Sequence, residues 1–62
     1  MDRDDILNVI IELSYSQGFY GRLLRDIREL EEGDPDRYEE FMEVLEAKNF
    51  SEPLDVVLFF ET

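Results

Sequence analysis

The sequence contains no cysteine and no histidine. These two absences exclude disulfide bridges, thiolate metal sites, catalytic pairs built on Cys or His, and pH switches based on imidazole. Long apolar runs are also missing, because the longest, Val56 to Phe60, is far shorter than the roughly 20 residues that cross a bilayer. Met1 is followed by Asp-Arg-Asp-Asp, which is unlike a signal peptide. We therefore expect a soluble protein of the cytoplasm that uses no cofactor.

Basic residues are scarce, since 6 Lys and Arg residues stand against 17 Asp and Glu residues, and the formal net charge is −11. Nucleic acids and anionic membranes would repel such a chain, because both are bound largely through Lys and Arg. A basic protein surface would instead attract it at long range. The predicted partner is a protein with a basic surface, without direct binding of nucleic acid or membrane.

Apolar residues are plentiful enough for a folded domain. They make up 44% of the chain, which is too many for an acidic disordered tail. A chain of 62 residues forms one domain at most and hides only about 60% of the surface that its unfolded form exposes. We predict a single small domain, residues 1-62, of modest stability.

Apolar side chains recur at helical spacing in three segments, which predicts helices at about residues 4 to 15, 18 to 32 and 35 to 48. Between the last two, Gly33 suits a left-handed position after a helix, Asp34 suits an N-cap and Pro35 suits a first helical turn. Asn49 suits the end of the third helix. The predicted fold is all-α, a compact bundle of three to four short helices.

The last segment, SEPLDVVLFFET, is ambiguous because Val-Val-Leu-Phe-Phe also has strong strand propensity. Ser51 as a cap, Pro53 in the first turn and Asp55 nearby favour a short fourth helix. The alternative is an extended C-terminus that pairs in a dimer. Because the segment is apolar on nearly every side, it is expected either to fill the centre of the bundle or to expose a patch for self-association.

The stretch SYSQGFYGRLLRDI holds two of the three glycines and two of the six basic residues, and a third basic residue, Arg28, follows it directly. On a helical wheel these residues gather on one side, at Gly18, Gly21, Arg22, Arg25 and Arg28. The roughly opposite side carries the residues expected to face the core, Phe19, Leu23, Ile27 and Leu30. The glycine and arginine side is a candidate second contact face. The alternative is structural, with glycines at a helix junction and each arginine paired with an acid four residues later.

Acidic residues dominate the segment from Glu29 to Glu46, which carries nine acids and one base, Arg37. Along the third predicted helix they recur every three to four residues, at Asp36, Glu39, Glu40, Glu43 and Glu46. Neighbouring Cβ atoms at this spacing lie about 5 to 6 Å apart, close to the interval between phosphates on a nucleic-acid strand. The pattern indicates a partner-binding face that mimics phosphates. The alternative is that these residues serve only helix propensity and solubility.

No catalytic or metal site is predicted. Acid-base catalysis by paired carboxyl groups requires a recessed site, which a chain this short can barely form. The sequence Asp34-Pro35-Asp36 does not continue into an EF-hand loop, because the required Gly and terminal Glu are not in place. We therefore expect a protein that is not an enzyme.

Two runs, SQGFYGRLLRDI and the later LDVVLFFE, resemble segments of small acidic proteins carried by bacterial phages and mobile elements. The resemblance implies a bacterial or phage setting and brings no known active site. It also implies a role in interaction with the host, such as inhibition of a restriction or CRISPR nuclease.

Together these features predict a non-enzymatic protein-protein interaction module. In the leading interpretation it is a phage or mobile-element inhibitor that presents its acidic helix to a nucleic-acid-binding host protein. The alternative is a small structural helical protein that self-associates, as a homodimer for example, through its apolar C-terminal segment.

Overall fold

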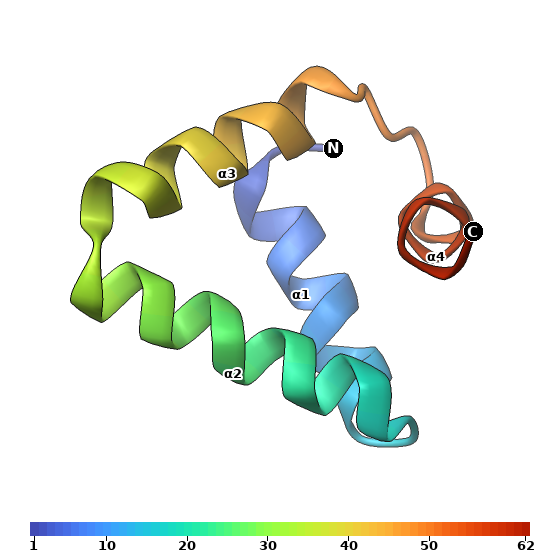
Figure 1. The fold of residues 1–62 in the computed structure, drawn as a ribbon. Helices are drawn as coiled ribbons and strands as arrows, with labels where there is room; N and C mark the ends of the chain where they lie inside the picture. Colours follow the sequence, from blue (N-terminus) through green and yellow to red (C-terminus); the bar gives the residue numbers. More distant parts are fainter.

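The computed structural model describes all 62 residues and consists of four α-helices joined by short turns (Figure 1). The helices are α1 (Arg3–Ser14), α2 (Gly18–Gly33), α3 (Pro35–Ala47) and α4 (Pro53–Glu61). The predicted all-α bundle is confirmed, and the ambiguous last segment is a helix rather than an extended chain.

Acidic side chains cap the starts of α1 and α3. The Asp2 carboxylate accepts a hydrogen bond from the backbone N–H of Asp5 at 3.0 Å, and the Asp34 carboxylate accepts one from the backbone N–H of Arg37 at 3.3 Å. Pro35 follows Asp34 directly, where its fixed φ suits a helix and its missing N–H is not needed. Negative charge at these positions also interacts favourably with the helix dipole.

One of the two predicted helix ends is confirmed and the other is wrong. Asn49, just after α3, has a positive φ of 55°, the left-handed conformation that stops a helix. Gly33 is not left-handed, because no glycine in the chain has a positive φ. Gly33 instead belongs to the last turn of α2, and Asp34, with a φ of −147°, turns the chain directly into α3.

The start of α4 depends on Asp55. Its carboxylate accepts hydrogen bonds from the backbone N–H and the hydroxyl of Ser51, at 2.9 and 2.8 Å, and from the backbone N–H of Glu52 at 3.2 Å. These bonds, with that of the Ser51 N–H the strongest, lower the pKa of Asp55. Ser51 is therefore not the N-cap that we predicted, because the helix begins one residue later, with Glu52 as N-cap and Pro53 as its first residue.

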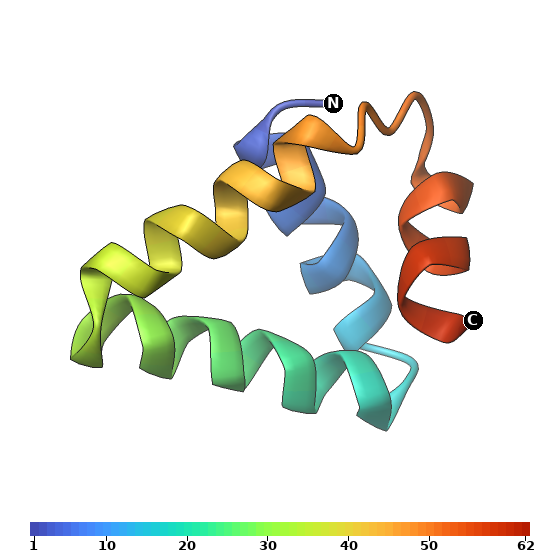
Figure 2. The same ribbon diagram turned by 45° about the horizontal axis from the view of Figure 1, so that its top comes forward.

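Helix α1 is the centre of the packing. Its backbone approaches those of the other three helices, whereas the backbone of α4 approaches only that of α1 (Figures 1 and 2). Ten side chains are buried: Ile6, Val9, Ile10, Tyr20, Ile27, Tyr38, Met42, Leu45, Phe50 and Val56. Their removal from water is the main term that stabilises so small a domain.

The core face of α2 is only partly the one predicted, because Ile27 is buried and Leu23 and Leu30 pack against the core, but Phe19 does not. Phe19, expected in the core, is 52% exposed, whereas its neighbour Tyr20 is fully buried. Tyr20 reaches α4, where its hydroxyl donates a hydrogen bond to Glu61 at 2.8 Å. Burial, helped by this bond, raises the pKa of Tyr20 to about 12. The inward side of α2 therefore includes Tyr20 and Leu24 beside the predicted Leu23, Ile27 and Leu30.

Helix α4 divides its apolar side chains between the core and solvent. Val56 is fully buried, and the ring of Phe59 packs edge-on against that of buried Phe50, with ring centroids 5.7 Å apart. On the outer side, Leu54 and Leu58 are 56% and 53% exposed. The segment therefore contributes to the core and also leaves an apolar patch uncovered, where we had expected one or the other.

Candidate interaction surfaces

The predicted acidic face of α3 is divided in two by Arg3 of α1. The Arg3 guanidinium forms ion pairs with Glu39 at 2.7 Å and with Glu46 at 2.9 Å, and it lies 5.9 Å from the centre of the Tyr38 ring. The hydrogen bond from Arg3 lowers the pKa of Glu39, and the two carboxylates, Glu39 first, raise the pKa of Arg3. Glu39 and Glu46 thus hold α3 against α1, and because Arg3 already neutralises part of their charge, they attract a cationic partner less strongly.

The other three residues of that face form what we call the acidic row, Asp36, Glu40 and Glu43. All three are exposed, and no Lys or Arg nitrogen lies within 4.0 Å of their carboxylates. Their spacing of four and then three residues places them along one side of the helix. The structure therefore leaves the acidic row free to face a cation from outside the chain.

The residues of the predicted second contact face do not share one role. Gly18 is open to solvent, but a Cβ on Gly21 would lie 3.9 Å from the carbonyl oxygen of Ser14, so Gly21 belongs to the junction of α1 and α2. Arg22, Arg25 and Arg28 are exposed, and none of the expected ion pairs with acids four residues later is formed.

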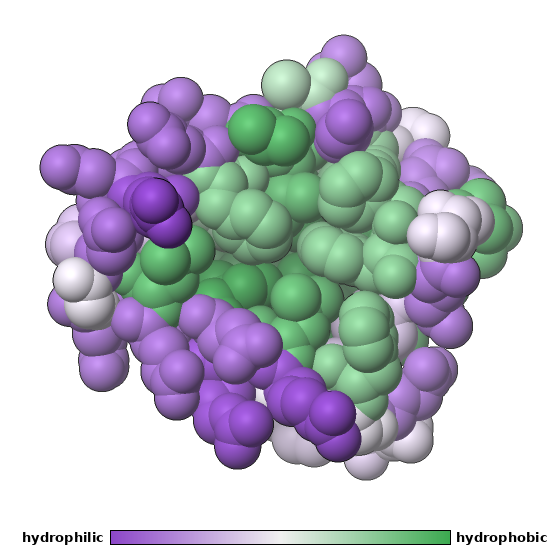
Figure 3. Space-filling model, viewed as in Figure 1, coloured by the Kyte–Doolittle hydropathy of each residue, from purple (hydrophilic) through white to green (hydrophobic).

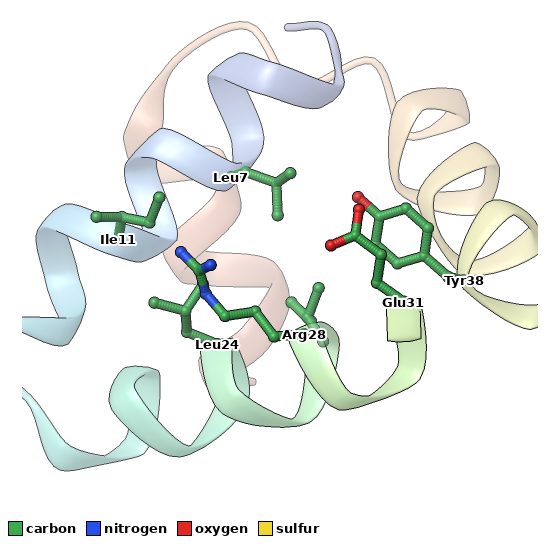
Figure 4. Close-up of a pocket in the computed structure, with 7 residues that line it drawn as sticks. Leu7, Ile11, Leu24, Arg28, Glu31 and Tyr38 are labelled. Atoms are coloured by element: carbon green, nitrogen blue, oxygen red, sulfur yellow. The ribbon is translucent and has the colours of Figure 1, made fainter. Parts of the chain in front are cut away.

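Arg28 lies instead beside a small cavity between α1, α2 and Tyr38 of α3, with a volume of about 110 Å³ (Figure 4). Leu7, Ile11, Leu24 and Ile27 supply its apolar wall, and the charged groups of Arg28 and Glu31 lie on opposite sides of its opening. Burial, with the charge of Glu31 as a smaller cause, raises the pKa of Tyr38. The cavity is well below the roughly 300 to 1,000 Å³ of typical small-molecule sites, so it holds a single side chain at most.

The larger hollows lie between α2 and α3, on the side away from α1. One, of about 220 Å³, is lined by Leu23, Asp26, Ile27, Leu30 and Phe41. The next, of about 410 Å³, is lined by Leu30, Arg37, Glu40, Phe41 and Val44. The two hollows are adjacent, because Leu30 and Phe41 line both, and we call them together the apolar groove.

Figure 3 shows this face, since α1 lies behind α2 and α3 in that view and neither hollow contains a residue of α1. Hydrophobic side chains fill its middle, between α2, α3 and α4, and hydrophilic residues surround them. The groove was not among the surfaces predicted from the sequence. A signal was present, because α2 carries a second apolar stripe beside Tyr20 and Leu24, and α3 carries Phe41 and Val44 outside its buried stripe.

Comparison of the chain with protein-family models, with curated proteins and with solved structures gives no match. None of the four helices has the length and apolar character needed to cross a membrane. The structure groups no three acidic side chains in an arrangement that could hold a metal ion.

Proposed function

We propose that this protein is a non-enzymatic interaction module that binds a basic surface of a protein partner through the acidic row. The observation that carries the proposal is that Asp36, Glu40 and Glu43 lie exposed along one side of α3 and form no ion pair within the chain. Like charges three and four residues apart repel one another and destabilise a helix. A partner that brings cations to the row would reduce this repulsion.

The rest of α3 makes the row a stable platform. Tyr38, Met42 and Leu45 are buried on the opposite side of the helix, and Arg3 ties its flank to α1. The helix backbone that carries the carboxylates is therefore in place before binding, so only their side chains must be ordered on association. A net charge of −11 adds long-range attraction to any basic partner.

The partner class that best fits such a row is a nucleic-acid-binding protein, whose binding groove is lined with Lys and Arg to neutralise phosphates. Carboxylates spaced along a rigid helix occupy such a groove in place of phosphates. The proposed partner is a protein in the cytoplasm of a bacterial host, a setting suggested by the resemblance of two segments to small acidic proteins of phages and mobile elements. In this proposal the protein acts as an inhibitor that competes with nucleic acid.

The test compares two triple variants that change the net charge equally. In one, Asp36, Glu40 and Glu43 are replaced by Lys, and in the other Lys replaces three exposed acids outside the row, Glu12, Glu29 and Glu32. Each immobilised protein is used to capture partners from bacterial lysate, which are identified by mass spectrometry and challenged with salt and with double-stranded DNA.

We expect the wild type and the control variant to capture a basic nucleic-acid-binding protein, which salt and DNA release. The variant with Lys at positions 36, 40 and 43 should not capture it. Circular dichroism confirms that both variants stay folded. Equal retention by the row variant would show that the acidic row is not the binding surface.

A second candidate function, self-association, is favoured by the outer side of α4. Leu54 and Leu58 are both more than half exposed there, one helical turn apart. Sedimentation equilibrium at high protein concentration tests this candidate, which predicts a dimer that the double variant Leu54→Gln and Leu58→Gln abolishes. A monomer at every concentration would remove it.

A further inference from the structure

The apolar groove is a hydrophobic surface that the chain itself leaves uncovered. Val44, on its α3 edge, is 54% exposed, and Leu23, Leu30 and Phe41 are only partly buried. A domain of this size gains most of its stability from apolar burial, so apolar surface left in water lowers a stability that is already modest. Continuous exposed apolar surface with a polar rim is a mark of a binding site.

The C-terminal helix does not fill the groove. Its backbone approaches that of α1 alone, and no residue of α4 lines either hollow. The occupant must therefore come from outside the chain.

The charges beside the groove indicate what kind of occupant fits. Asp26 lies on the α2 side and Glu40 on the α3 side, while the one base, Arg37, lies 3.8 Å from the carboxylate of Asp34. Glu40 is both a lining residue and the middle member of the acidic row, so the groove and the row are continuous. A second copy, also with a charge of −11, would bring acidic rims together, whereas a cationic segment would be attracted.

We propose that the apolar groove binds a cationic amphipathic helix of the partner. Apolar side chains three and four residues apart on that helix seat over Leu30 and Phe41, as in other helix-in-groove complexes. Its Lys and Arg side chains then lie over Glu40 and the rest of the acidic row. This inference rests on the proposed function, to which it adds the form of the partner segment.

The test uses two peptides of about 14 residues, roughly four helical turns, made only of Leu and Lys. One has Leu at helical spacing on a single face, and the other has the same composition in a scrambled order. Affinities are measured by titration calorimetry, and contacts are mapped by NMR chemical-shift changes. The variant Val44→Gln alters the groove at a half-exposed position, and Phe19→Gln is a matched control at 52% exposure near the start of α2, outside the groove.

The expected result is that the amphipathic peptide shifts the signals of Leu23, Leu30, Phe41 and Val44. Val44→Gln should weaken its binding about tenfold, the cost of removing one well-packed apolar contact, while Phe19→Gln leaves it unchanged. Equal binding of the scrambled peptide, shifts confined to α4, or a dimer closed through the groove would each overturn the inference.

The outcomes also separate this inference from the proposed function. If both peptides bind equally and replacement of Asp36, Glu40 and Glu43 by Lys abolishes binding, the acidic row acts by charge alone and the groove has no part. If the amphipathic peptide binds in the groove of that triple variant as tightly as in the wild type, the groove is a docking site and the acidic row is not.

Discussion

Replacement of Gly21 by Ala is predicted to stabilise the protein. Gly21 is the fourth residue of α2 and has an ordinary helical φ, and the added Cβ would meet only the carbonyl oxygen of Ser14, at 3.9 Å, a normal van der Waals distance. Nothing in the fold therefore requires glycine there. In a helix interior, Gly costs about 0.8 to 1.0 kcal/mol relative to Ala, so the gain in unfolding free energy should approach 0.8 kcal/mol. For a domain this small, that gain corresponds to a rise of about 4 to 6 °C in Tm.

The assay is thermal and urea unfolding followed by circular dichroism, combined with the binding assay for the acidic row. Gly18→Ala is the control, because Gly18 has equally open space but is the first residue of α2, where helix propensity counts for less. A lower Tm for Gly21→Ala would refute the packing argument at the α1 and α2 junction. A higher Tm together with lost binding would instead identify Gly21 as part of a contact face.

Three further predictions concern the core, the attachment of α4 and acid sensitivity. Met42→Ala empties a fully buried position and should cost about 2 to 5 kcal/mol, most of the stability of so small a domain, seen as loss of the cooperative urea transition. Tyr20→Phe removes the hydrogen bond to Glu61 and should lower the unfolding free energy by about 1 kcal/mol, whereas Tyr15→Phe, 85% exposed, should leave it unchanged. The pKa of Asp55 is lowered from 3.8 in the folded state, so its stabilising effect is complete above that value and is lost as the pH falls through the folded-state pKa. Asp55→Asn should therefore lower the unfolding free energy at neutral pH, and this free energy should then fall less on acidification than in the wild type. Urea unfolding at a series of pH values tests this, and an equal fall in the variant and the wild type would contradict it.

The helices could be predicted because their signals are local. Apolar side chains recur at helical spacing, and the caps Asp2 and Asp34 act on backbone N–H groups within three residues. Even the ambiguous last segment was decided by neighbours, since Pro53 and Asp55 favour a helix start more strongly than the valines favour a strand. Such effects do not depend on where the rest of the chain lies.

The packing of the helices could not be predicted in detail, because it depends on which of several apolar side chains of a helix contacts a neighbouring helix. Phe19 and Tyr20 are neighbours at the edge of the apolar side of α2, and the burial of Tyr20, with its hydrogen bond to Glu61 of α4, decides which of the two lies inside. The pairing of Arg3 with Glu39 and Glu46 joins residues far apart in the sequence, so no local pattern indicated that part of the acidic face is used inside the molecule.

The central place of α1 also implies an order of folding. The contacts of α1 with α2 and of α2 with α3 join neighbours along the chain, whereas the contact of α1 with α4 joins the first helix to the last. Closing a longer loop costs more chain entropy, so the first three helices should assemble first and α4 should dock last. In stopped-flow experiments, substitutions where α4 meets α1, such as Val56→Ala, should then mainly speed unfolding, while substitutions between α1 and α2, such as Ile10→Val, should also slow folding.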